Sequence, residues 1–193
     1  MDKLLLFEVK RKLAHVLLTF WPLLFVLFGF SKAMDLALYL TYLAFMLSSE
    51  FIRIRYNYNT PTAMLIKSFS RSTLNDRLKD EWNRIRIPYW IFGGLFAMAL
   101  FGPQVVVAST VCLTFGDAAS GVTKALLRKR QSFAGTGIGI VVSLLLIYAF
   151  TGNIAIAVLS SVIGMIGDTS NLVNDNLSIP LLAAIGAYVG SLV

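Results

Sequence analysis

The sequence has little charge and a single cysteine, and each shortage excludes a class of protein. Only 14% of the 193 residues are charged and 57% are hydrophobic, with a mean hydropathy of +0.75. An average soluble domain has roughly a quarter of its residues charged, so this composition excludes a water-soluble globular domain. Cys112 stands in an apolar run, and a lone cysteine excludes an intrachain disulfide and a cysteine-based zinc site.

Acidic residues are also scarce, with 10 Asp and Glu against 17 Lys and Arg and a net charge of +7. On a membrane protein such an excess marks cytoplasmic loops and an affinity for anionic phospholipid. We therefore expect membrane lipids, and not nucleic acid, as partners. The basic N-terminus precedes a long apolar run that no A-x-A cleavage site follows, which favours a retained first span over a signal peptide.

Apolar runs that are long enough, or nearly so, to cross a hydrocarbon core of about 30 Å recur along the whole chain. They cover residues 13–30, 33–52, 87–101, 104–122, 133–150, 154–167 and 177–193. Turn residues such as Gly102-Pro103 and Thr151-Gly152-Asn153 separate them. We therefore expect an all-α polytopic transmembrane helical bundle of about seven spans, forming a single membrane-embedded domain over residues 1–193.

The basic residues predict the orientation of this bundle. With a cytoplasmic N-terminus, the basic segments 1–12, 53–86 and 124–130 all lie on the cytoplasmic side, and Lys32 is the only basic residue outside. Within 53–86, apolar residues recur at the spacing of an amphipathic helix: Leu74, Leu78, Trp82 and Ile85. This pattern predicts an interfacial helix on the inner leaflet.

Ionisable and amide side chains gather at the predicted cytoplasmic ends of the spans. Each ionisable residue inside a membrane costs about 2.5 to 3.5 kcal/mol and is by default a functional candidate. The set comprises Glu8, Arg11, Lys12, His15, Glu50, Arg53, Asp117, Asp168, Asp175 and Asn176. The outer face has almost no polar chemistry, which disfavours a transport path across the membrane.

Some of these residues have a structural as well as a functional interpretation. Asp117 lies among the small residues of segment 116–121, where a carboxylate needs a cation; that cation is either part of a bound ligand or a lysine at a helix crossing. Arg11 and Lys12 also fit a snorkelling basic collar. His15, the single histidine, is a functional group or is satisfied by Glu8 or a backbone carbonyl.

The segment 116–139 has the composition of a phosphate-binding loop. Lys124 and Arg128 precede a serine and glycine-rich helix start at 132–139, where backbone N–H groups and the positive helix end favour phosphate. Asp168 and the triplet 174–176 add oxygen ligands that suit Mg²⁺ shared with a nucleotide. An ordinary polar turn with helix caps is the alternative for 174–176.

These residues together resemble the membrane CTP-dependent polyprenol kinases, which include dolichol kinase, phytol kinase and the CTP-dependent diacylglycerol kinase. Phosphatidate cytidylyltransferases are more distant relatives. The resemblance covers most of the chain. It rests on Glu8-x-x-Arg11-Lys12-x-x-His15, Glu50-x-x-Arg53, Gly116-Asp117-Ala118-Ala119 with Gly121 and Lys124, Ser132-x-x-Gly135-Thr136, and Asp175-Asn176-x-x-Ile179-Pro180.

The resemblance implies a lipid kinase that transfers the γ-phosphoryl group of CTP to the hydroxyl of an isoprenoid alcohol such as dolichol, polyprenol or geranylgeraniol. By this resemblance Asp117 and Asp175 hold Mg²⁺, with Asn176 assisting. Phosphates are bound by Lys124, Arg128, Ser132 and the Gly135-Thr136 backbone. Asp168 or His15 orients or deprotonates the alcohol, with Asp117 as a further catalytic residue. Arg11, Lys12 and Arg53 balance charge around the nucleotide.

Three questions stay open at the level of sequence. Family members have a lysine and a glutamate where this chain has Gln131 and Ala134, so ATP stands beside CTP as a donor. A cytidylyltransferase and a non-catalytic membrane protein or transporter are the rival functions. Gly186-x-x-x-Gly190 suggests a homodimer. The expected location is a cell or ER-type membrane, with the site facing the cytoplasm.

Overall fold

The computed structural model describes residues 31–56, 101–128, 132–169 and 175–193, together with isolated positions among the first 30 residues. These residues form helices and turns, with no strand among them, which confirms the expected all-helical class. The predicted span 87–101, nearly all of span 13–30 and nearly all of the loop 53–86 with its interfacial helix lie outside the described residues, save Phe101.

The remaining predicted spans each fall on a helix. Span 33–52 lies within α3 (Lys32–Tyr56), and span 104–122 lies within one continuous helix from Pro103 to Leu126. That helix consists of α7 (Pro103–Val111), a π-helical turn η1 (Cys112–Gly116) and α8 (Asp117–Leu126). The chain continues through α9 (Phe133–Thr151), α10 (Ile154–Ile166) and α11 (Asp175–Ser191).

Local sequence explains where these helices begin and end. Pro103 occupies the first turn of α7, where its missing N–H removes no helical hydrogen bond. Gly152 ends α9 in the left-handed conformation, with φ of 65°, which a glycine adopts without steric cost. The Asn153 side chain then accepts hydrogen bonds from the N–H groups of Ala155 and Ile156 and begins α10. The predicted turns at 102–103 and 151–153 are therefore confirmed.

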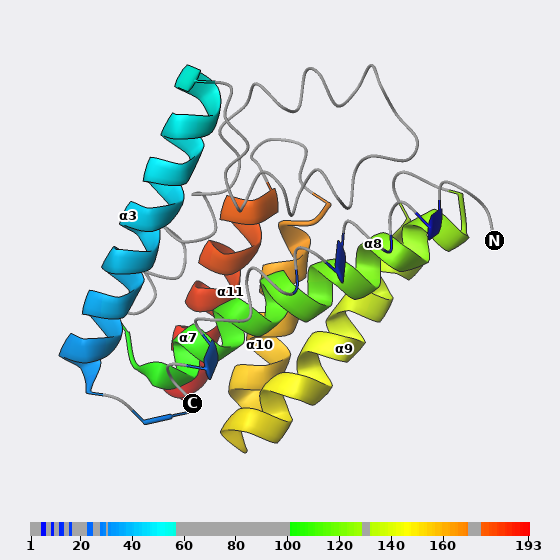
Figure 1. The fold of residues 1–193 in the computed structure, drawn as a ribbon. Helices are drawn as coiled ribbons and strands as arrows, with labels where there is room; N and C mark the ends of the chain where they lie inside the picture. The colour runs from blue at the N-terminus through cyan, green and yellow to red at the C-terminus, as the bar shows by residue number, and fades with distance from the viewer. Residues whose placement is uncertain are drawn as a thin grey trace.

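Within the continuous helix, α7 and η1 contact α9, α10 and α11, and α8 contacts α9 (Figure 1). α10 and α11 pack closely, because glycines leave room for backbone to approach backbone. A Cβ on Gly186 would lie 2.5 Å from the Leu159 carbonyl oxygen, and one on Gly190 would lie 2.7 Å from the Ile156 Cα. Both glycines of the predicted dimerisation motif thus face α10 of the same chain, so this motif does not present a surface to a second copy.

Two described helices are long and apolar enough to cross a membrane. They are Pro103–Leu126, with 24 residues, and Phe133–Thr151, with 19, which correspond to about 36 and 28 Å at 1.5 Å per residue. The first is mostly buried in the bundle, whereas most of α9 is not. The exposed side of α9 is apolar and includes Ile138, Val141, Leu145 and Tyr148. Such a contiguous apolar surface is unusual against water, which favours contact with lipid.

Candidate functional site

Two lysine–aspartate ion pairs, one buried and one partly buried, lie close together in the bundle. Lys12 Nζ lies 2.6 Å from Asp117 Oδ2, and both side chains are less than a tenth exposed. Lys124 Nζ lies 2.7 Å from Asp168 Oδ2, and the Asp168 side chain is only 6% exposed. Of the two alternatives for the cation that Asp117 needs, the structure therefore provides a lysine.

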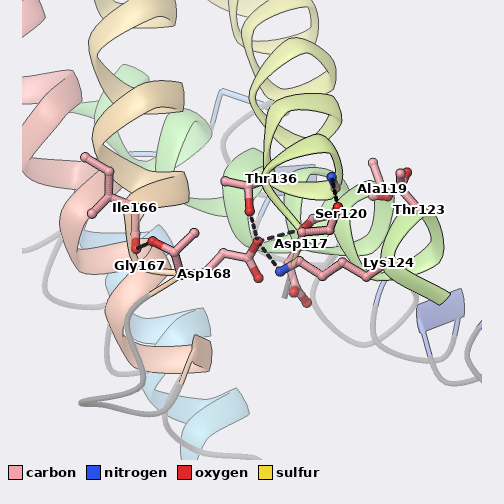
Figure 2. Close-up of polar contacts among 12 residues, drawn as sticks. Asp117, Ala119, Ser120, Thr123, Lys124, Thr136, Ile166, Gly167 and Asp168 are labelled. Atoms are coloured by element: carbon pink, nitrogen blue, oxygen red, sulfur yellow. Dashed lines mark hydrogen bonds and ion pairs between the residues drawn. The ribbon is translucent and has the colours of Figure 1, made fainter. Parts of the chain in front are cut away.

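Asp168 joins three helices through one oxygen atom (Figure 2). Its Oδ2 accepts hydrogen bonds from Ser120 Oγ of α8 at 2.7 Å, from Lys124 Nζ at 2.7 Å and from Thr136 Oγ1 of α9 at 3.0 Å. Asp168 itself follows the end of α10. One oxygen of Asp168 therefore connects α8, α9 and the end of α10.

Each of the two lysine side chains passes directly over a glycine before it contacts its aspartate. A Cβ on Gly121 would collide with Lys12 Cε and lie 3.0 Å from its Nζ. A Cβ on Gly135 would lie 2.6 Å from Lys124 Cγ and 3.1 Å from the Ser120 carbonyl oxygen. These two glycines therefore leave the space through which the lysine side chains reach the carboxylates.

The π-helical turn η1 ends directly before Asp117. An inserted residue shifts everything that follows by about 100° around the helix axis, given 3.6 residues per turn, and π-turns inside α-helices occur often at functional sites. The π-helical turn therefore sets the direction in which the Asp117 side chain points away from the helix axis. Next to it, a Cβ on Gly139 would lie 2.8 Å from the Gly116 carbonyl oxygen, so the two glycines allow α9 to pack closely here.

Asp175 adds a third carboxylate near both ion pairs. It begins α11 and precedes the predicted span 177–193. Although part of Asp175 remains exposed, burial of the rest raises its pKa, and the charges of Asp117 and Asp168 raise it further. Lys12 and Lys124 oppose this increase in pKa. Among the described residues, three carboxylates and two lysines therefore influence one another electrostatically at this site.

The start of α9 presents backbone donors beside this cluster. Ser132 caps the helix, because its Oγ accepts a hydrogen bond from the Gly135 N–H at 3.4 Å. The Thr136 N–H donates to the Ser132 carbonyl, so the backbone donors assigned by sequence to phosphate are already used. No described residue accepts from the N–H groups of Phe133 and Ala134. These two donors at the positive helix end are the ones open to an anion.

The structure brings together part of the site expected from sequence. Lys12, Asp117, Lys124, Thr136 and Asp168 meet in the two ion pairs and their hydrogen bonds. The other described candidates lie at adjacent helix ends: Arg128 after α8, Ser132 before α9, and Asp175 and Asn176 at the start of α11. Arg11 and His15 lie outside the described residues, and Arg53 falls on α3 with its side chain outside the description.

Sequence reasoning missed Ser120, which is fully buried and binds Asp168. Its signal was present in the small-residue segment 116–121, where a serine one turn after Asp117 faces the same neighbouring helices. The π-helical turn was also missed, because nothing in the residues 112–116 distinguishes it from an ordinary α-helical turn.

The donor set bears on the expected metal. Among the described residues, no group of three or more His, Cys, Asp or Glu side chains is close enough to hold a metal ion. Mg²⁺ is usually held by one or two carboxylates together with phosphate oxygens. The carboxylates of this site therefore fit a Mg²⁺ ion that binds together with phosphate.

No protein-family model matches the chain, and no curated protein or solved structure matches it either.

Proposed function

We propose that this protein is an integral membrane lipid kinase that transfers the γ-phosphoryl group of CTP, or of another nucleoside triphosphate, to the hydroxyl of an isoprenoid alcohol. The observation that carries the proposal is the cluster of two ion pairs beside the start of α9. Lys12 and Asp117 are buried, and Lys124 and Asp168 are partly buried. The order of the sequence motifs that resemble the CTP-dependent polyprenol kinases supports it independently.

Phosphoryl transfer demands little covalent chemistry from a protein. It needs positive charge around the phosphates, alignment of the reacting groups and a residue that orients the attacking hydroxyl. Lys124 and the N–H groups of Phe133 and Ala134 supply positive charge and donors, with Arg128 in the adjoining loop. Asp168, which the hydrogen bonds from Ser120, Lys124 and Thr136 hold beside these groups, would orient the alcohol hydroxyl.

Mg²⁺, when bound, neutralises the phosphate charge that develops during transfer. Asp117 and Asp175 are the residues that would hold it, and Asn176 follows Asp175 in the first turn of α11. Lys12 and Lys124 then balance the remaining charge. His15 stays a second candidate for orienting the hydroxyl, from a part of the chain that the structure does not describe.

The lipid tail of the substrate stays in the bilayer under this proposal, while the nucleotide arrives from water. The apolar exposed side of α9 supports a lipid-facing bundle. We propose about seven membrane spans with a cytoplasmic N-terminus, of which the two long apolar helices are part. In this topology the basic segments lie on the same side of the membrane as the site.

Cysteine labelling tests this topology. Leu127→Cys and Gln104→Cys should react with an impermeant maleimide from opposite sides of the membrane. Buried Cys112 should give little background.

A product assay tests the function. Purified protein is incubated with CTP or ATP labelled at the γ-phosphate or in the base, and with a panel of lipid alcohols. A kinase yields lipid monophosphate carrying the γ label and a nucleoside diphosphate, whereas a cytidylyltransferase given a lipid phosphate yields a CDP-lipid and pyrophosphate. Asp117→Asn should abolish turnover in protein that still folds, and Asp35→Asn on α3 is the charge-matched control. Near-normal activity of Asp117→Asn, or no product with any alcohol, would contradict the proposal.

A further inference from the structure

We infer that Thr136 and Ser120 are positioning residues for the proposed transfer, because their hydroxyl groups set the orientation of the Asp168 carboxylate that directs the attacking alcohol. The inference rests on the proposed function and deepens it. It moves Thr136 from the phosphate-binding segment to the alcohol side of the reaction, and it adds Ser120 to the site.

The Asp168 carboxylate depends on neighbouring helices for its orientation. Asp168 lies in the turn that follows α10, where its N–H donates to the Met165 carbonyl oxygen at 3.2 Å. This bond holds the backbone but does not set the plane of the carboxylate, because the χ2 torsion of aspartate is broad and roughly two-fold. Hydrogen bonds to the carboxylate itself are needed to select one orientation.

Two of these hydrogen bonds come from hydroxyl groups on two different helices (Figure 2). Ser120 Oγ of α8 donates to Asp168 Oδ2 at 2.7 Å, and Thr136 Oγ1 of α9 donates to the same atom at 3.0 Å. Both donors belong to buried residues. The two helices are closely packed here, since a Cβ on Gly139 would lie 3.2 Å from Ser120 Cβ. The packing of α8 against α9 therefore places both donors.

The third donor to this oxygen is of a different kind. Lys124 Nζ lies 2.7 Å from Asp168 Oδ2, but its ammonium group stands at the end of a flexible four-carbon stem. A serine or threonine hydroxyl is attached directly to Cβ, so the helix that carries it fixes its place. Lys124 therefore provides positive charge at the carboxylate, whereas the two hydroxyls determine its orientation.

The Thr136 hydroxyl also differs from other helical threonines of this protein. Thr41, Thr123 and Thr151 each donate to the carbonyl oxygen four residues earlier in the chain, which is the local bond open to a threonine in a helix. Thr136 donates to Asp168. Since a hydroxyl carries a single proton, the contact with a distant carboxylate takes the place of the local bond.

Orientation matters because Asp168 would receive the proton of the alcohol. In the proposed transfer the alcohol oxygen bonds to the γ-phosphorus, the bond from this phosphorus to the β–γ bridging oxygen breaks, and the nucleoside diphosphate leaves with that electron pair. The alcohol proton passes to the Asp168 carboxylate and then to water. A misplacement of about 1 Å can cost about 100-fold in rate. Loss of a positioning hydroxyl should therefore lower kcat and leave the KM for the nucleotide little changed.

The test compares threonine variants of the full chain in lipid nanodiscs, with kcat and the KM for CTP measured for lipid phosphorylation. Thr136→Val keeps the shape of the side chain and removes the hydroxyl, so kcat should fall about 100-fold with little change in the KM for CTP. Thr136→Ser keeps the hydroxyl and loses a methyl group, so it should restore most of that loss. Thr41→Val on α3 removes a hydroxyl that bonds to the Ala37 carbonyl, and it should keep the kcat of the unchanged protein.

A merely structural role predicts a different pattern. Valine and serine at position 136 would then each lower the thermal unfolding midpoint, and kcat would follow the amount of folded protein. Positioning requires that kcat follow the hydroxyl among variants that are folded at the assay temperature. Ser120→Ala removes the second donor from α8 and should also lower kcat with the KM for CTP retained, so it provides the test if Thr136→Val does not fold.

The outcomes separate this inference from the proposed function. Lipid phosphorylation by the unchanged protein is measured first, and its absence with every alcohol overturns both. If the unchanged protein phosphorylates an alcohol, normal kcat in Thr136→Val, or a Thr136→Ser variant as slow as Thr136→Val, overturns the inference alone. A rise in the KM for CTP with kcat retained returns Thr136 to the phosphate-binding residues. Failure of both Thr136→Val and Ser120→Ala to fold assigns the hydroxyls to stability and overturns the inference as well.

Discussion

Lys12 and Asp117 are 105 positions apart in the sequence, yet Lys12 Nζ donates a hydrogen bond of 2.6 Å to Asp117 Oδ2 inside the bundle. The contact ties the N-terminal segment to the first residue of α8, directly after the π-helical turn. Since both side chains are buried, neither charge has water as an alternative partner. The pair therefore holds Lys12 against the first residue of α8 at the candidate site.

Removing one member of this pair should cost more stability than removing both. Breaking a buried ion pair from one side typically costs about 3 to 5 kcal/mol, because the remaining charge loses its oppositely charged neighbour. We expect Lys12→Met and Asp117→Asn each to lower the free energy of unfolding by an amount near that range, and the double variant to lower it by less than the sum. A double-mutant cycle on thermal or denaturant unfolding in micelles measures the coupling. Additive effects would show that the pair does not contribute.

Two glycine substitutions in α9 should distinguish the loss of the space that Lys124 occupies from a general change in helix stability. A Cβ at Gly135 would lie 2.6 Å from Lys124 Cγ and 3.1 Å from the Ser120 carbonyl oxygen, whereas one at Gly137 would meet nothing within 4 Å. We expect Gly135→Ala to destabilise the protein by about 1 to 3 kcal/mol through overpacking and to reduce nucleotide binding. Gly137→Ala should stabilise it by up to about 1 kcal/mol through helix propensity.

The readouts are the unfolding midpoint and the thermal shift with Mg²⁺ and CTP, recorded for both variants in parallel. Equal behaviour of Gly135→Ala and Gly137→Ala in both measurements would contradict the assignment of Gly135 as space for Lys124.

The sequence predicts the described helices well, because their signals are local. Apolar length, Pro103 at a helix start and the capping pair Gly152 and Asn153 act within a few residues of where they stand. The carboxylates and lysines of the site were also found by sequence, because an ionisable group in an apolar run is conspicuous by itself.

The partners of these groups could not be predicted, because they depend on how helices distant in sequence pack. The pairing of Lys124 with Asp168 requires α8 and the end of α10 to meet, and no local pattern encodes that. The small-residue pattern at Gly186 and Gly190 indicates a close helix contact, but it does not tell a neighbouring helix of the same chain from a second copy. The structure places both glycines against α10.

Two buried serines should respond differently to the same substitution. Ser120 Oγ donates to Asp168 Oδ2 at 2.7 Å, whereas Ser161 Oγ on α10 is buried and has no hydrogen-bond partner in the part of the chain that the structure describes. Loss of a hydrogen bond to a charged group typically costs about 1.5 to 3 kcal/mol. We expect Ser120→Ala to lower the free energy of unfolding by about that amount, and Ser161→Ala to be neutral or stabilising. Denaturant unfolding of the two variants in the same micelles measures this; a cost at Ser161 equal to that at Ser120 would contradict the role of the Asp168 hydrogen bond.

Asp175 should make the ligand-free protein less stable at neutral pH than at acidic pH. Its pKa is raised by burial and by Asp117 and Asp168, so the folded state binds a proton more tightly than the unfolded state does. Its contribution to the free energy of unfolding is therefore lost as the pH rises from about 3.9, the ordinary aspartate value, through the raised pKa. Asp175→Asn should stabilise the ligand-free protein at pH 7 by less than about 1 kcal/mol, since solvent screens a partly exposed charge.

The gain in stability should vanish as the pH falls below about 3.9, where aspartate becomes protonated in both states. Thermal unfolding recorded from about pH 3 to about pH 8 measures this change. Under the proposed function the same variant loses a ligand of Mg²⁺, so its stabilisation by Mg²⁺ with CTP should fall while its ligand-free stability rises. Asp35→Asn on α3 removes one aspartate charge from another helix and should leave the response to Mg²⁺ with CTP unchanged. An Asp175→Asn variant that is less stable than the unchanged protein at pH 7 would show that this carboxylate is satisfied within the fold and is not held there for a cation.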